Sequence, residues 1–175
     1  MNKILYSFYH FECRLFKKVN RHFDKKLLNL FFGTITHAGG ATFLIVTILV
    51  VIFFSSNQTR LTAISSAVAL ALSHLPVQIV KRIFPRKRPY LILDRAKFPD
   101  KPLKDHSFPS GHTTAIFSII TPFIFFFPSL FIFLLPLGLS VGLSRIYLGL
   151  HYPSDVLAGV ILGVGTGTVC HYLIL

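Results

Sequence analysis

The chain has 175 residues, of which 53% are hydrophobic and 19 are phenylalanine, and its formal net charge is +12. This composition excludes an ordinary water-soluble domain and predicts a single unit embedded in a membrane. The positive charge leaves nucleic acid, anionic headgroups or a phosphorylated substrate as partners, so the positions of the charges have to decide among them.

Residues 1–27 are expected to form an amphipathic helix in the headgroup region of the membrane. Apolar residues, among them Phe8, Phe11 and Leu15, recur at steps of three and four, which is the spacing of one helical face. Seven charges between residues 12 and 25 exclude a membrane span. An interfacial helix is therefore the simplest interpretation, and a helix packed on a soluble partner is the alternative.

Five apolar segments follow, and each is expected to be a membrane-spanning helix of about 20 residues. The first is expected to bend or break at Gly39-Gly40 and to end near Ser55, and a tight turn over residues 57–60 should follow it. The other four are Leu61–Val80, Thr113–Phe127, Ser129–Leu148 and Val156–Leu175. A lone chain of this pattern cannot close a barrel, so the predicted fold is all-α: a polytopic transmembrane helix bundle of about five spans, with residues 28–175 as its core.

The glycines at positions 159, 163 and 167 of the last segment are spaced so that another helix can approach closely, and we interpret them as structural. A lone histidine within the second segment, His74, is interpreted as a helix-packing hydrogen-bonding residue rather than a proton relay.

Three polar clusters fall on one membrane face under this threading. The first covers residues 81–89 and contains Lys81 and Arg88; the other cations within it, at positions 82, 86 and 87, are interpreted as membrane anchors. The second is residues 108–112 at the start of the third span, where a helix N-terminus with a glycine offers free N–H groups to a phosphate. A plain helix cap by Ser110 is an equal alternative for this second cluster.

The third cluster runs from Ser144 to Asp155. Pro153 suits the first turn of a new helix, which would let Asp155 reach back to His151. A carboxylate on one ring nitrogen fixes the tautomer and leaves the other nitrogen free as a nucleophile. Arg145 can hold an anion in front of the His151 ring. The alternative is that this cluster is only a polar cap at the membrane surface, without a catalytic role. Three clusters on one face, however, form a cationic site with a nucleophile and an acid, and such a site fits phosphoryl chemistry.

The three clusters together resemble a known signature. Lys81-x6-Arg88-Pro89, Pro109-Ser110-Gly111-His112 and Ser144-Arg145-x5-His151-x3-Asp155 are similar to the three-part motif of the type 2 phosphatidic acid phosphatase (PAP2) superfamily. The chain looks like its bacterial undecaprenyl-diphosphate phosphatases and phosphatidylglycerophosphatase B-like members. The resemblance implies a membrane lipid phosphatase, with undecaprenyl diphosphate as the first candidate substrate. Phosphatidylglycerophosphate, phosphatidic acid and diacylglycerol pyrophosphate are the alternatives.

The resemblance also implies residue roles. His151 would attack phosphorus and become a phosphohistidine, Asp155 would orient it, and His112 would protonate the leaving oxygen and then activate water. The phosphoryl oxygens would be bound by residues from all three clusters, namely Lys81, Arg88, Ser110, Gly111 and Arg145. Such a site needs no metal or other cofactor. The expected partners are the lipid substrate and the bilayer, with no nucleic acid and no obligatory protein partner.

Other classes of function have less support. A non-catalytic binder of anionic lipids would need the cations but not His112, His151 and Asp155. A transporter would need polar residues deep in several spans, for which His74 and Gln78 are thin support. Nucleic-acid binding fails because the charges lie on segments tied to the membrane. A phosphotransferase would share the phosphatase mechanism.

Two arguments disagree about which side of the cell membrane holds the site. With five spans, the N-terminal helix and the three clusters share one side, and of the 18 Lys and Arg only Arg60 lies opposite. The positive-inside rule then predicts a cytoplasmic site, whereas the resemblance implies an extracytoplasmic one. We expect the extracytoplasmic face, because at least three of those cations would be bound to substrate.

Overall fold

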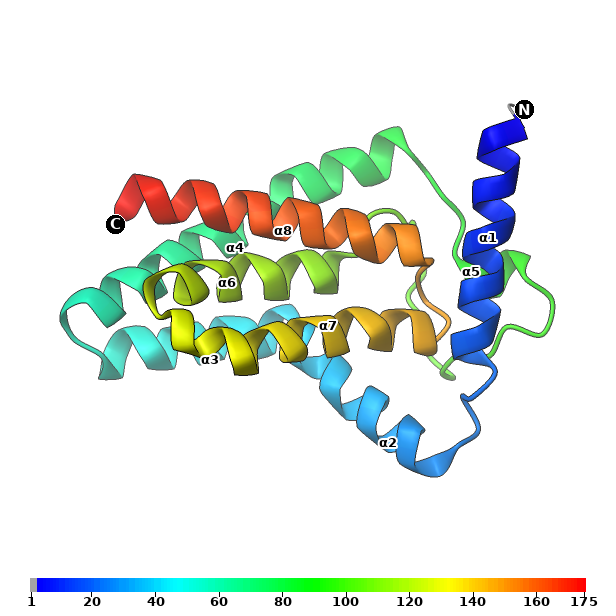
Figure 1. The fold of residues 1–175 in the computed structure, drawn as a ribbon, viewed down its shortest axis with the longest axis horizontal. Coiled ribbons are helices and arrows are strands. Elements are labelled where there is room, and N and C mark those ends of the chain that lie inside the picture. Colours follow the sequence, from blue (N-terminus) through cyan, green and yellow to red (C-terminus); the bar gives the residue numbers. More distant parts are fainter. Residues whose placement is uncertain (1–2) are drawn as a thin grey trace.

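A computed structural model describes residues 3–175, and Met1 and Asn2 lie outside the described residues. All regular elements between residues 3 and 175 are helical, which confirms the all-α prediction. In chain order they are α1 (Lys3–Asn20), α2 (Lys26–Ile35), η1 (Thr36–Gly39), α3 (Ala41–Phe54), α4 (Asn57–Ile83), α5 (Pro89–Ile92), α6 (Gly111–Phe126), η2 (Pro128–Leu130), α7 (Phe131–Tyr147) and α8 (Pro153–Ile174). Figure 1 shows α3, α4, α6, α7 and α8 as a bundle, with α1 crossing one end of it.

The N-terminal helix α1 ends at Asn20, so the predicted boundary at residue 27 is wrong: the chain turns over residues 21–25, and a second helix, α2, begins at Lys26. On α1 the predicted apolar face is open, since Phe8 and Phe11 are 55% and 51% exposed. A different face, which includes Glu12 and Phe16, is buried, and α1 packs on α7 and α8 of the same chain. The exposed apolar face is what a helix at the membrane interface needs, and that location stays a prediction.

The first apolar segment is bent, as its glycines predict. Lys26–Gly39 and Ala41–Phe54 meet at an angle of 60°. The predicted tight turn at 57–60 is wrong, because these residues form the first turn of α4. The reversal takes place at Ser55-Ser56, and the Arg60 side chain donates a hydrogen bond of 2.9 Å from Nε back to the Ser55 carbonyl. The polar residues therefore indicated the correct region for the chain reversal. The sequence did not show that Arg60, a residue of α4, would stabilise the reversal by bonding back to Ser55.

The structure supports several membrane crossings. Three helical segments are long and apolar enough to span a membrane, namely Asn57–Ile83, Pro128–Tyr147 and Pro153–Ile174, and the bent pair would be a fourth. The helix α6 is apolar but shorter, with 16 residues. The chain is therefore a multi-pass helical membrane protein, and the number five stays a prediction.

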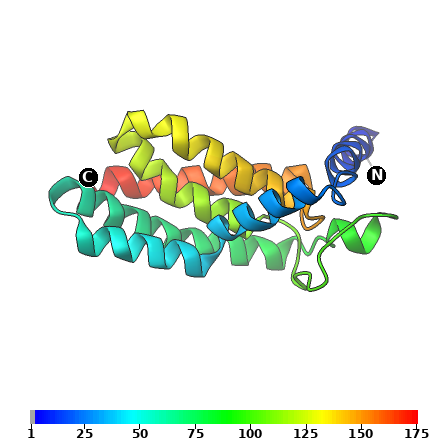
Figure 2. The ribbon, with the colours of Figure 1, turned by 90° about the horizontal axis from the view of Figure 1, so that it is seen from below.

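The helix α6 lies in the middle of the bundle, in contact with α4, α7 and α8 (Figure 2). Its contact with α8 is almost backbone to backbone. A methyl group added at Gly163 would lie 2.5 Å from the Thr114 carbonyl oxygen, and one at Gly159 would lie 2.8 Å from the Ser110 carbonyl oxygen. The structural interpretation of these glycines is confirmed. The close packing also fixes the N-termini of the two helices side by side, where the Ser110 N–H donates to the Asp155 carbonyl at 3.0 Å.

The loop 84–110, the junction 148–152 and α1 all lie at the same end of the bundle (Figure 1). The turns at 55–56 and around η2 lie at the other end, with the C-terminus. The three polar clusters are therefore brought to one end, as the threading predicts.

Candidate active site

His151 and Asp155 form a pair at the start of α8. Pro153 is the first residue of α8, and His151 Nδ1 lies 3.6 Å from Asp155 Oδ2. The same carboxylate oxygen accepts the Tyr152 N–H at 2.7 Å and the Ser107 hydroxyl. Asp155 thus also caps its helix, and it faces the imidazole from one side only. A proton on Nδ1 is the tautomer that this arrangement favours, which leaves the lone pair on Nε2.

His151 is only 1% exposed, and its pKa is lowered to about 4, chiefly because the ring is buried. The Asp155 carboxylate opposes this lowering, and the cations Arg145 and Arg88 contribute to it. Arg88 Nη1 lies 3.2 Å from His151 Nε2, on the side opposite to the carboxylate contact. At neutral pH the ring is therefore uncharged, and Nε2, the nitrogen without a proton, accepts a hydrogen bond from Arg88 Nη1.

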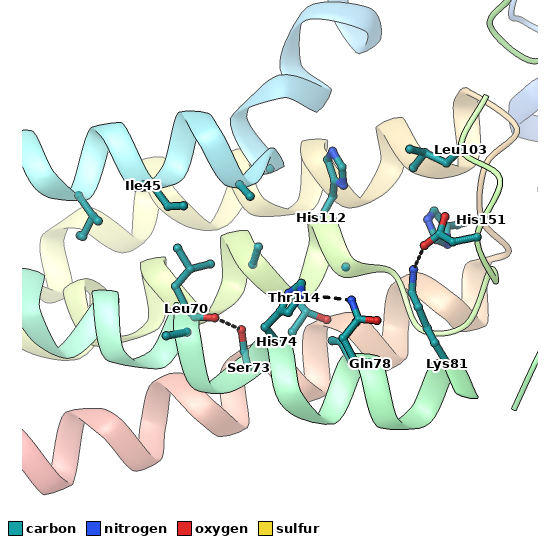
Figure 3. Close-up of a pocket in the computed structure, with 18 of the residues that line it drawn as sticks. Ile45, Leu70, Ser73, His74, Gln78, Lys81, Leu103, His112, Thr114 and His151 are labelled. Atoms are coloured by element: carbon teal, nitrogen blue, oxygen red, sulfur yellow. Dashed lines mark hydrogen bonds and ion pairs between the residues drawn. The ribbon is translucent and has the colours of Figure 1, made fainter. Parts of the chain in front are cut away.

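Asp105 is a residue of the site that the sequence reasoning missed. Its carboxylate forms ion pairs with Lys81 and with Arg88, the latter at 2.6 Å from Nη2 to Oδ1. Burial would raise the pKa of Asp105, but Lys81 and Arg88 outweigh it and lower the pKa to about 2. The Lys81 ion pair lies next to His151 (Figure 3). The Asp105 carboxylate is thus paired with the two cations that are expected to bind phosphate. This role could not be predicted from the sequence, because nothing in the loop distinguishes Asp105 from the other aspartates there.

The start of α6 provides Ser110, Gly111 and His112. The cap interpretation of Ser110 is wrong, because its buried hydroxyl bonds Thr113 Oγ1 at 2.9 Å and makes no cap to the helix backbone. Gly111 and His112 line a cavity, and Figure 3 shows His112 rising from the start of α6 into the space beside α3. The helix N-terminus is therefore open toward the cavity.

Arg145 is 3% exposed and holds a guanidinium that is only partly paired. Its Nη1 donates to Thr36 Oγ1 at 2.7 Å, whereas Nε and Nη2 have no partner among residues 3–175. Nε and Nη2 form one edge of the guanidinium, the geometry that binds two oxygens of a phosphate or carboxylate. Because buried unpaired donors are costly, this edge indicates an anion site.

Two cavities meet at His112. The first, of about 600 Å³, has Lys81, Arg88 and His151 at one end and apolar side chains of α3 and α4 at the other, including Ile45, Leu49 and Leu70. The second, of about 550 Å³, is lined by Arg145 and by polar residues from α2, η1 and the long loop, including Asn29, His37, Asp100 and Lys101. Within residues 3–175, the two linings share only His112 and Leu103.

The structure therefore brings the predicted site residues together. Five of them line the first cavity (Lys81, Arg88, Gly111, His112 and His151), and Arg145 lines the second. Asp155 and Ser110 are not part of either lining: Asp155 contacts His151, and Ser110 contacts Thr113 of α6. The helix-packing role expected of His74 is wrong: it faces the first cavity and bonds Gln78 of its own helix at 3.1 Å. Residues 3–175 hold no group of three or more His, Cys, Asp or Glu suited to a metal, and independence of a metal stays a prediction.

These features define a helical membrane protein with an anion site built around a His–Asp pair. The model of the PAP2 superfamily matches residues 62–175, and the chain belongs to that superfamily.

Named relatives and a solved structure agree with this assignment. The chain is 34% identical over 98 residues to the lipid A 1-phosphatase of Rhizobium etli, which covers 54% of this chain but only 42% of that relative's length. It is 25% identical over 154 residues to the undecaprenyl-diphosphatase of Sulfolobus acidocaldarius, covering 87% of this chain and 73% of that protein. The crystal structure of Aquifex aeolicus LpxE superposes with a TM-score of 0.81 at 26% identity, covering 90% of this chain and 92% of that one.

Proposed function

We propose that the protein is a membrane phosphatase that removes a phosphate group from a lipid through a phosphohistidine, without a metal, and that undecaprenyl diphosphate is its first candidate substrate. The observation that carries the proposal is the first cavity. It joins the His151 and Lys81 end of the site to apolar walls between membrane helices, so it suits a phosphate attached to a hydrocarbon chain.

The chemistry follows from the positions of the two histidines. His151 Nε2 attacks phosphorus, the bond from phosphorus to the lipid oxygen breaks, and His112 gives that oxygen a proton. Water then attacks the phosphohistidine, His112 takes the proton from the water, and the phosphorus–nitrogen bond breaks to release phosphate. Arg88 and Arg145 stabilise the charge on the phosphoryl oxygens throughout, which is the main source of catalysis in phosphoryl transfer.

The second cavity adds a further cation to the phosphate site. It lies on the other side of His112 and is lined by Arg145, whose guanidinium has an unpaired edge. Phosphatidylglycerophosphate, phosphatidic acid and diacylglycerol pyrophosphate remain the competing substrates. A non-catalytic lipid binder would have no use for the His151–Asp155 pair.

Phosphate release by the purified protein tests the proposal. The substrates are undecaprenyl diphosphate, phosphatidylglycerophosphate, phosphatidic acid, diacylglycerol pyrophosphate and the soluble p-nitrophenyl phosphate. We expect release that survives EDTA, is lost in His151→Ala and is fastest with undecaprenyl diphosphate. Release that persists in His151→Ala, or that chelation abolishes and Mg²⁺ restores, would contradict the mechanism. Transfer of the phosphate to an added alcohol instead of water would identify a phosphotransferase.

The role of the cavity is tested with a matched pair of variants on α4. Ala71 lines the first cavity, whereas its neighbour Leu72 is 47% exposed and is not part of the lining. Ala71→Trp should therefore slow lipid hydrolysis strongly and leave p-nitrophenyl phosphate hydrolysis nearly unchanged, and Leu72→Trp should change neither. Equal losses on both substrates in Ala71→Trp would show that the cavity does not hold the lipid chain.

We further propose that the protein lies in the cell membrane with the active site on the extracytoplasmic face. Two arguments support this orientation. The first is the resemblance to the family. The second is that Lys81, Arg88 and Arg145 would bind the substrate phosphate and would therefore not count as free positive charges in the positive-inside rule.

A further inference from the structure

Glu12 is an acidic residue buried on a basic helix. It is the one acid of α1, and it is 4% exposed. A carboxylate is buried at large cost unless it is paired and hydrogen-bonded. Both of its oxygens are paired here: Oε1 with Arg86 Nη2, and Oε2 with the Ser154 hydroxyl.

Arg86 extends this contact to the candidate active site. Its Nη1 donates to Asp155 Oδ1 at 2.8 Å and to Ser154 Oγ at 2.7 Å, and its guanidinium carbon lies 3.8 Å from the centre of the Tyr152 ring. Burial would lower the pKa of Arg86, but Asp155 and Glu12 outweigh it and raise the pKa. The membrane-anchor interpretation of Arg86 is therefore wrong, since its charge is turned inward between α1 and α8.

The two oxygens of Asp155 have different partners. Oδ2 faces His151 and accepts from Tyr152 N–H and the Ser107 hydroxyl, whereas Oδ1 is held by Arg86. A carboxylate held at both oxygens cannot turn about its bond to Cβ. Arg86 thus fixes the orientation in which Oδ2 meets the imidazole, and it offsets part of the negative charge that the imidazole experiences.

We infer that Arg86 is a positioning residue of the active site and that Glu12 makes α1 a working part of it: docking of α1 holds Arg86 against Asp155, and so holds the orientation that His151 requires. The inference rests on the proposed function for its kinetic readout, but the geometry it describes can also be measured without activity.

Removing the two charges should move the pKa of His151 in opposite directions. Without Arg86, the Asp155 carboxylate is less compensated and stabilises the imidazolium more, so the pKa rises. Without the Glu12 charge, Arg86 opposes Asp155 more strongly, so the pKa falls. The other titratable and charged groups facing the pair come from α4, α6, α7 and the loop 84–110, and both substitutions leave them in place: Lys81, His112, Arg145, Arg88 and Asp105.

The experiment measures kcat, KM and the pH profile of kcat/KM for Arg86→Ala, Arg86→Lys and Glu12→Gln. Asp24→Asn is the matched control, because Asp24 is another acid of the N-terminal segment that pairs with the loop, through Lys97, and has no contact with the site. We expect Arg86→Ala to lower kcat by roughly 10–100-fold, the range for loss of an outer-shell partner, with KM changed much less. Its acid limb should move to higher pH, that of Glu12→Gln should move to lower pH, and Asp24→Asn should behave as the unaltered protein.

A shift in the same direction for Arg86→Ala and Glu12→Gln, or no shift in either, would overturn the inference. Thermal unfolding identifies variants that fail to fold, and if Arg86→Ala does so, the direction of the shift in Glu12→Gln still decides. NMR titration of the His151 imidazole, assigned by its loss in His151→Ala, reads the same pKa shifts without turnover. If the protein hydrolyses no substrate but these shifts appear, the proposed function fails and the positioning role stands.

Discussion

The two histidines of the site have different surroundings, and this difference assigns them different work. His151 is enclosed between Asp155 and Arg88, whereas His112 lies where the two cavities meet. An enclosed, uncharged ring with an oriented lone pair suits a nucleophile. A ring with space on both sides can reach a leaving oxygen first and an entering water afterwards.

The first prediction separates these roles by the leaving group. His112→Ala should slow hydrolysis of a simple lipid monoester by about 10²–10⁴-fold, the range for acid–base assistance, because an alkoxide needs a proton in order to leave. Phosphoenzyme formation from p-nitrophenyl phosphate should suffer much less, whereas His151→Ala should be inactive on every substrate. Rapid-quench measurement of labelled enzyme gives both rates, and a uniform loss in His112→Ala would mean that His112 binds phosphate instead.

Asp105 provides the second prediction, because it competes with phosphate for Lys81 and Arg88. Its pKa of about 2 keeps it charged throughout the working pH range. Asp105→Asn should therefore lower the inhibition constant for inorganic phosphate by several-fold, since the two cations become available. Asp94→Asn, an exposed residue of the same loop, is the control. Weaker phosphate inhibition in Asp105→Asn would show that the carboxylate serves to hold the cations in place.

The residues of the signature were predictable because each motif fixes a chemical type at a fixed spacing. The roles of Asp105, Arg86 and Glu12 were not. Their partners lie 17 to 74 positions away in the chain, through ion pairs that no local pattern records.

At the scale of the elements, the contact between α6 and α8 holds the site together. The two helices approach so closely that Gly163 faces the backbone of α6, and their N-termini carry His112 and Asp155 respectively. Anything that separates the helices also separates the proposed general acid from the pair that contains the proposed nucleophile.

The third prediction tests this contact. Gly163→Ala places a methyl group 2.5 Å from a backbone oxygen, whereas nothing lies within 4 Å of the same methyl at Gly165. Overpacking of this kind costs about 1–3 kcal/mol. Gly163→Ala should lower the unfolding temperature and the activity together, and Gly165→Ala should do neither. An equal effect of the two substitutions on thermal unfolding in detergent would contradict the close packing.

The apolar segments were predictable at this scale, because a membrane span is recorded in composition alone. The start of α4 at Asn57 and the end of the N-terminal helix at Asn20 were not. Both depend on contacts made after folding, namely the Arg60 side chain on the Ser55 carbonyl and the docking of α1 through Glu12.

For the molecule as a whole, charge and site are gathered at one end of the bundle. Of the 18 Lys and Arg, Arg60 alone belongs to the opposite end. Several of the cations at the site end are occupied within the protein: Lys81 and Arg88 by Asp105, and Arg86 by Glu12 and Asp155. These paired charges contribute less to orientation in the membrane than a simple count implies.

The fourth prediction concerns this orientation. In a background in which the buried Cys13 and Cys170 are replaced by alanine, single cysteines are placed at Arg95, in the exposed part of the loop, and at Ser56, at the opposite end. A membrane-impermeant maleimide added to intact cells should label the Arg95 position alone. Permeabilised cells, in which both should react, are the control. Labelling of the Ser56 position alone would place the site in the cytoplasm.

The 60° bend before α3 lies directly beside the candidate active site. A methyl group at Gly39 would lie 3.0 Å from the His112 carbonyl oxygen, so the start of α6 packs directly against the bend. With α3 crossing the hydrocarbon as proposed, the bend would turn α2 toward the bilayer plane and would place His112 near the level of the lipid headgroups. Under the proposed function, a lipid phosphate would then reach the site by moving sideways within its own leaflet, and no energy would be spent in lifting it out of the membrane.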